Sequence, residues 1–126
     1  MIILSLLLLA AGGPEIPVAF WRSGDDDLSV RFYEQVDRSI AGHVRLRPAS
    51  AADDVRFALY AESNVRPLDR GGGGFSYRVS LREGRSANGR VLARFDGKCV
   101  DAIAVCADRL VGRVAARIAR LSSRER

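Results

Sequence analysis

Apolar residues recur along this chain with two different spacings, and the shorter one predicts strands. Apolar and polar positions alternate over residues 55–61 and again over residues 75–81, as they do on a strand with one buried face. Residues 91–95 read as a return strand, because the Asn88-Gly89 dipeptide before them favours a hairpin turn. These three segments predict an antiparallel meander with one apolar and one polar face.

A spacing of three to four residues predicts two amphipathic helices. The first covers residues 27–41, after a run of three aspartates at 25–27 that reads as an N-terminal cap, with a cation site as the alternative. The second covers residues 102–122. Its apolar stripe consists of Ile103, Ala107, Leu110, Val114, Ile118 and Leu121. A short strand at residues 16–21 precedes both helices.

The order of elements is therefore β-α-β-β-β-α, which predicts the α+β class. We expect a three- to four-stranded, mostly antiparallel sheet with two helices packed on one face, since a half-apolar sheet needs a cover. We expect a single domain over residues 14–122 and a basic tail at residues 123–126.

The first 13 residues are typical of a secretory signal peptide. The apolar run at residues 2–11 leads into the small residues Ala-Ala-Gly-Gly at 10–13, which suit signal peptidase, and the run is too short to span a bilayer. Cleavage would place the mature protein in the periplasm or outside the cell, with no transmembrane segment. An uncleaved anchor, a start further upstream and a buried first strand are the alternatives.

Cys99 and Cys106 are the two cysteines of the chain. A close pair in an exported protein predicts a structural disulfide. Free thiols are the first alternative. A redox pair fits poorly because the spacing is not Cys-x-x-Cys, and a metal site fits poorly because His43 is the sole histidine. We expect no cofactor, no metal and no catalytic residue.

Positive charge is concentrated at the end of the chain. Residues 109–126 hold six arginines and one acid, whereas the 14 basic and 14 acidic residues before them cancel, so this segment accounts for the net charge of +5. One side of the second helix is predicted to carry Arg109, Arg113, Arg117, Arg120 and Arg124. This arginine row is either a solvated face or a docking surface for a cell-envelope protein or an anionic surface. Nucleic acid is an unlikely ligand, because the leader and the cysteine pair point away from the cytoplasm.

Several segments together resemble a known periplasmic module. They are the strand Ile-Pro-Val-Ala-Phe, the acid-capped helix, the strand Val-Arg-Phe-Ala-Leu-Tyr-Ala, the hairpin around Asn88-Gly89 and the closing helix. In this order they are similar to the amino-terminal domain of TolB and, in outline, to CsgG and the LpoB-type activators. The resemblance implies a protein-interaction module without catalytic residues. The chain lacks the propeller of TolB and the lipid-anchor cysteine of the other two.

The sequence thus favours a non-enzymatic periplasmic interaction module whose specific role and oligomeric state it does not define. Docking would use either the arginine row or the exposed sheet face, where Arg78, Arg82 and Tyr60 are expected. The alternative is a small secreted enzyme or ligand-binding protein whose site is formed by scattered residues, which predicts a deep pocket.

Overall fold

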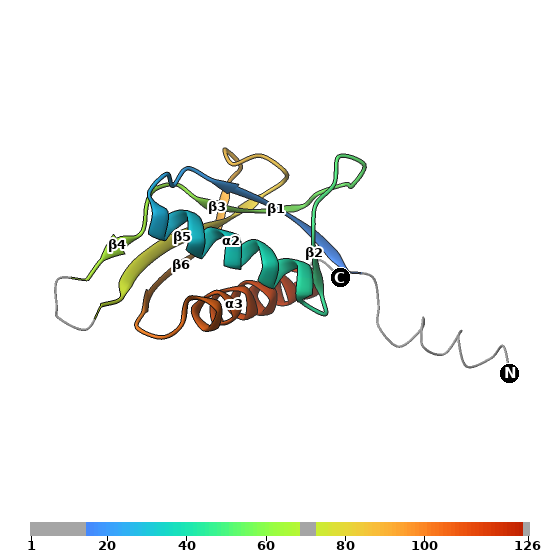
Figure 1. The fold of residues 1–126 in the computed structure, drawn as a ribbon. Helices are drawn as coiled ribbons and strands as arrows, with labels where there is room; N and C mark the ends of the chain where they lie inside the picture. Colours follow the sequence, from blue (N-terminus) through green and yellow to red (C-terminus); the bar gives the residue numbers. More distant parts are fainter. Residues whose placement is uncertain (1–14, 69–72, 125–126) are drawn as a thin grey trace, which may run out of the picture.

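A mixed sheet covered on one side by two helices forms the body of the protein (Figure 1). The computed structural model describes residues 15–68 and 73–124, so the predicted leader at residues 1–13 lies outside this part of the chain. The elements are β1 (Ile16–Arg22), α2 (Asp27–Gly42), β2 (Leu46–Pro48), β3 (Phe57–Ala61), β4 (Arg66–Pro67), β5 (Phe75–Glu83), β6 (Val91–Cys99) and α3 (Ile103–Arg124).

The sheet has six strands, so the expected count of three to four is wrong. The predicted meander of β3, β5 and β6 is confirmed as antiparallel, but β1 pairs in parallel with both β2 and β3. The sheet is therefore mixed. Helix α2 is the crossover of the β1-α2-β2 unit, as a parallel connection requires. β4 adds two residues beside β5 on the same side as β3.

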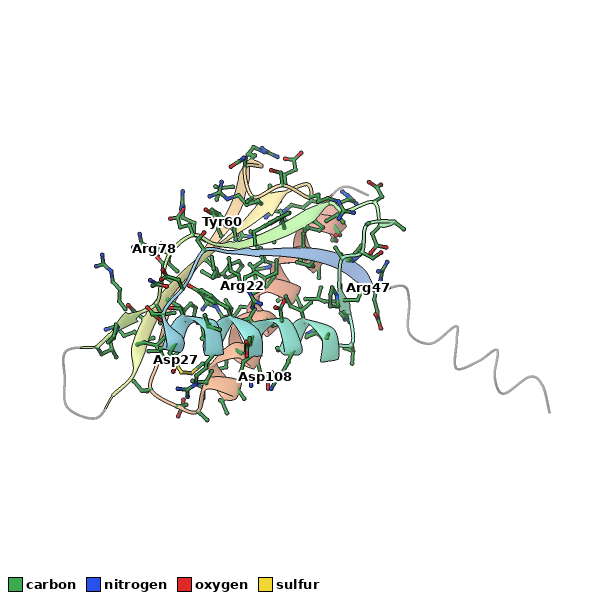
Figure 2. All side chains as sticks on the ribbon, turned by 45° about the horizontal axis from the view of Figure 1, so that its top comes forward. Arg22, Asp27, Arg47, Tyr60, Arg78 and Asp108 are labelled. Atoms are coloured by element: carbon green, nitrogen blue, oxygen red, sulfur yellow. A yellow bond between two sulfur atoms is a disulfide. The ribbon has the colours of Figure 1, made fainter. Side chains whose placement is uncertain are left out.

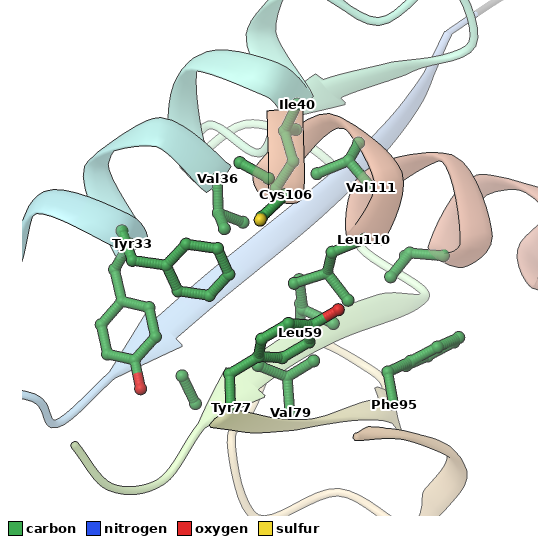
Figure 3. Close-up of a cluster of buried hydrophobic side chains, with 14 of the residues drawn as sticks. Tyr33, Val36, Ile40, Leu59, Tyr77, Val79, Phe95, Cys106, Leu110 and Val111 are labelled. Atoms are coloured by element: carbon green, nitrogen blue, oxygen red, sulfur yellow. The ribbon is translucent and has the colours of Figure 1, made fainter. Parts of the chain in front are cut away.

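The core lies between the helices and the sheet, as the two predicted apolar stripes require. Figure 3 shows side chains from α2, α3 and the strands converging there. Leu59 from β3, Leu81 from β5 and Leu110 from α3 are each 0% exposed. The inward positions predicted for β3 and β5 are buried, and the α2 stripe is buried at Phe32, Val36 and Ile40.

The aspartate run caps α2, as predicted. Asp26 is the N-cap residue and accepts a hydrogen bond of 2.7 Å from the backbone N–H of Ser29. Asn64 fixes the same corner, because its side chain accepts from the backbone N–H of Asp25 and donates to the Asp25 carboxylate. Among the described residues there is no group of three or more side chains suited to a metal ion, here or elsewhere.

The turn between β5 and β6 differs from the one expected. A two-residue turn at Asn88-Gly89 would need positive φ there, yet the positive φ of this connection, 86°, is at Gly84. The strands are joined by a loop over residues 84–90. The loop folds over the outer face of the sheet, where Trp21 Nε1 donates to the Arg85 carbonyl and Arg85 donates to the carbonyls of Ser50 and Asp53.

Candidate binding site: the arginine row of α3

Three contacts spread along helix α3 connect it to β6. At its start a disulfide joins Cys99 to Cys106, with the two Cα atoms 5.7 Å apart, so the predicted bridge is present. In its middle the Arg113 guanidinium lies 5.4 Å from the centre of the Phe95 ring. Near its end Leu121 and Leu92 line the same hollow. The helix therefore runs back along β6, antiparallel to it.

The two flanks of α3 have different neighbours. One flank faces α2, because the Ser39 hydroxyl donates a hydrogen bond of 2.8 Å to the Asp108 carboxylate (Figure 2). The other flank faces β6 through Arg113. The helical spacing of the five arginines places them together on this second flank. The arginine row expected from the sequence is thus a continuous feature beside β6.

Most arginines of the row are exposed and lack an acidic partner. Arg109 pairs with Asp101 at 2.7 Å, and Arg113 covers the Phe95 ring. The remaining three form no ion pair with any residue that the structure describes: Arg117 is half-buried, and Arg120 and Arg124 are exposed. Adjacent members stand three or four residues apart, where like charges destabilise a helix.

Five arginines outside α3 are paired with acids. Arg47 donates two hydrogen bonds, of 2.7 and 2.6 Å, to the two carboxylate oxygens of Asp53. These bonds, with the backbone N–H of Ser50 as a further donor, hold the pKa of Asp53 well below its usual value. Ion pairs also join Arg22 to Asp37, Arg31 to Asp27, Arg78 to Asp96 and Arg90 to Glu83.

On the exposed sheet face, the second expected docking surface, the two predicted arginines have partners within the fold. Arg78 pairs with Asp96 at 3.4 Å, and Arg82 lies 5.2 Å from the centre of the Tyr60 ring. Figure 2 shows Tyr60 and Arg78 on the side of the sheet away from the helices. Trp21, which was not predicted as a site residue, lies beside Tyr60 in the sheet and is 45% exposed. The alternation of residues 16–21 places Trp21 on the outward face, and this could have indicated that its side chain is exposed.

Two surface hollows could be considered as small-molecule sites. One, of about 500 Å³, lies on polar residues of β4, β5, β6 and the loop after β3, including Arg66 and Lys98. The other, of about 450 Å³, lies where α3 ends and mixes Phe57, Leu92 and Leu121 with arginines. The lining of the first hollow also includes hydroxyl groups and carboxylates, and its Asp96 is paired with Arg78. His43 ends α2, and its Nδ1 accepts from the backbone N–H of Arg45.

The fold is shared with solved bacterial proteins. No protein-family model and no curated protein matches the chain. A DUF330-family protein from Xanthomonas campestris matches with a TM-score of 0.66 and 10% identity, over 89% of this chain and 90% of its own. The PelC dodecamer from Paraburkholderia phytofirmans, in two space groups, gives TM-scores of 0.52 and 0.51 at 13% and 15% identity. The matches cover 83% and 82% of this chain, and 92% and 86% of PelC.

At these identities the likenesses show the α+β fold alone. The expected resemblance to TolB, CsgG and LpoB remains a prediction at that finer level. Within the described part of the chain, neither helix is long and apolar enough to cross a membrane.

Proposed function

We propose that this protein is a non-enzymatic interaction module of the bacterial periplasm, and that it binds an acidic segment of a cell-envelope protein along the arginine row of α3. One observation carries the proposal. Arg117, Arg120 and Arg124 are neighbours on one side of a helix and none of them has an acid partner among the described residues. A partner's carboxylates would supply the missing charges and relieve the repulsion along the helix.

The periplasmic location rests on the sequence and on the bridge. The expected leader would export the chain, and the Cys99–Cys106 disulfide suits an oxidising compartment. The similar α+β structures are compatible with such a module. A protein segment suits the row better than a membrane, because the row is one line of charge about 22 Å long rather than a broad basic face.

The test is direct binding of an acidic peptide to the purified protein, followed by fluorescence anisotropy. The probe is a labelled nine-residue peptide that alternates glutamate and valine. We expect measurable binding that weakens steeply between about 0.05 and about 0.5 M salt, because electrostatic screening increases strongly over this range. The double variant R117Q/R120Q should bind about tenfold more weakly, since it removes two charge-assisted contacts.

R38Q/R45Q is the matched control. Arg38 and Arg45 are also exposed and form no ion pair within the described residues, but they lie away from the row. A site-specific interaction predicts wild-type affinity for this control. Equal losses in the two double variants would mean that the peptide senses only net charge. A membrane surface is the alternative ligand, and vesicles with about 30% anionic lipid, which attract polybasic segments, test it. If the protein binds these vesicles and not the peptide, the row is a membrane-binding surface instead.

A further inference from the structure

Strand β6 is an open edge of the sheet. It pairs with β5 on one side, and no described strand pairs with its other side. The pairing with β5 is irregular only near Arg82, opposite the start of β6, and is regular from Ala93 to Cys99. About half of the backbone N–H and C=O groups in this stretch point away from β5, as in any edge strand.

The arginine row runs beside this edge. Three contacts spread along the strand fix the alignment: Cys99 is bonded to Cys106, Phe95 lies under Arg113, and Leu92 shares a hollow with Leu121. A strand added to β6 would turn alternate side chains toward the helix layer, where Arg113, Arg117 and Arg120 project. Carboxylates at every second position would therefore meet the row.

We infer that the partner segment binds as an extended strand added to β6, with its acidic side chains on the helix side facing the arginine row. This inference rests on the proposed function and names the form of its ligand. Backbone hydrogen bonds to β6 would supply affinity, and the arginines would select acidic residues at alternate positions. The opposite face of the added strand would meet Arg94, Asp96 and Lys98, which are exposed on β6.

A second copy of the chain is a poor occupant of the same edge. Antiparallel pairing of two β6 strands would continue the sheet and place both α3 helices on one face. The flanks that face the edge carry the arginine rows, so two rows of like charge would meet across the junction. Charge thus favours an acidic partner over self-association.

N-methylated peptides separate strand addition from simple charge attraction. Two forms of the glutamate–valine peptide are needed, one methylated on every glutamate amide and one on every valine amide. Both keep the charge and the side chains of the parent. In a strand, alternate residues direct their N–H groups to opposite sides, and the side-chain pattern fixes the register. Only one of the two forms therefore loses its hydrogen bonds to β6.

We expect one methylated form to bind at least about tenfold more weakly than the parent, because several hydrogen bonds are lost together, and the other to bind like the parent. Amide hydrogen exchange in β6 should slow with the parent peptide and not with the weak form. Equal affinities of the two methylated forms would overturn strand addition and leave the acidic-partner proposal intact. Absence of binding by the parent peptide would overturn the proposed function itself.

Discussion

Arginine serves two different purposes in two regions of this protein. In the sheet body Arg47 forms a two-point contact with Asp53, and Arg22 contacts Asp37 at 2.8 Å, so positive charge holds local structure together. On α3, Arg117 and Arg120 repeat at helical spacing with no acid among the described residues. Unpaired arginines that are neighbours on one helix, rather than the number of charges, distinguish the row from the paired arginines of the body.

The largest effect is expected where the two regions are joined. C99S/C106S should lower the free energy of unfolding by roughly 2–3 kcal/mol, because the bridge closes a short loop between β6 and α3. Urea unfolding followed by circular dichroism measures the loss, and wild-type protein reduced with dithiothreitol should match the variant. Acidic-peptide binding should weaken as well, since the bridge aligns the row with β6. Unchanged stability would mean that packing alone holds the helix in place.

Removal of arginine charge should change Tm in opposite directions in the two regions. R47Q should lower Tm by a few degrees, because it removes a bidentate partner from the Asp53 carboxylate. R117Q/R120Q should leave Tm unchanged or raise it slightly, because it relieves like-charge repulsion along the helix. Differential scanning calorimetry compares them. A fall in Tm for R117Q/R120Q as large as that for R47Q would show that the row is structural.

Sequence periodicity identified the parts of the fold that have a long repeating pattern. The alternating strands β3 and β5 and the two helical stripes were predicted with their buried faces, because one buried side imposes a period on many residues. β2 and β4 were not predicted as separate strands. Leu46–Pro48 and Arg66–Pro67 are too short to show a period, and each contains a proline. The parallel position of β1 depends on long-range pairing, of which the local sequence carries no trace.

Some features of the candidate site were predicted from the sequence and others were not. Spacing placed the five arginines on one side of a helix, and the close cysteine pair indicated the disulfide. Which flank of α3 would face β6 was not predictable, since it depends on the Asp108–Ser39 contact and on the stacking of Arg113 over Phe95. The association of the row with an open sheet edge therefore emerged only from the structure.

Acid should weaken the body while leaving the row charged. The pKa of Asp53 is lowered from its ordinary 3.8 by Arg47 and the Ser50 N–H, so its contribution is fully present above about pH 4. As the pH falls below that value the unfolded chain takes up the proton first, and the contribution is lost. D53N should have a lower Tm than wild type at about pH 5, where Asp53 is ionised in both the folded and the unfolded chain. The difference in Tm should become smaller as the pH is lowered to about 2.5. R117Q/R120Q should follow the wild-type pH profile, and a profile flattened like that of D53N would contradict the distinction.

Alkali tests the same distinction with the smallest effect. Burial, and secondarily Asp26, raises the pKa of Tyr33 to about 12, and its hydroxyl donates to the Ser63 carbonyl. Between pH 10 and 12 the unfolded chain loses this proton while the folded protein retains it, so stability should fall as pH rises through this window. Y33F should be about 1 kcal/mol less stable than wild type at about pH 9, below the window in which the unfolded tyrosine ionises. Above about pH 10 this variant should not show the fall in stability that Tyr33 causes in the wild type.

An arginine guanidinium does not lose its proton in proteins over this range. At about pH 10.5 the tyrosine of the unfolded chain ionises, so the wild-type Tm should have begun to fall. The affinity for the acidic peptide should be unchanged at this pH. A loss of affinity in step with Tm would show that the row depends on the marginal stability of the body. Constant affinity would show that charge on α3 and stability in the sheet are separable properties of one small fold.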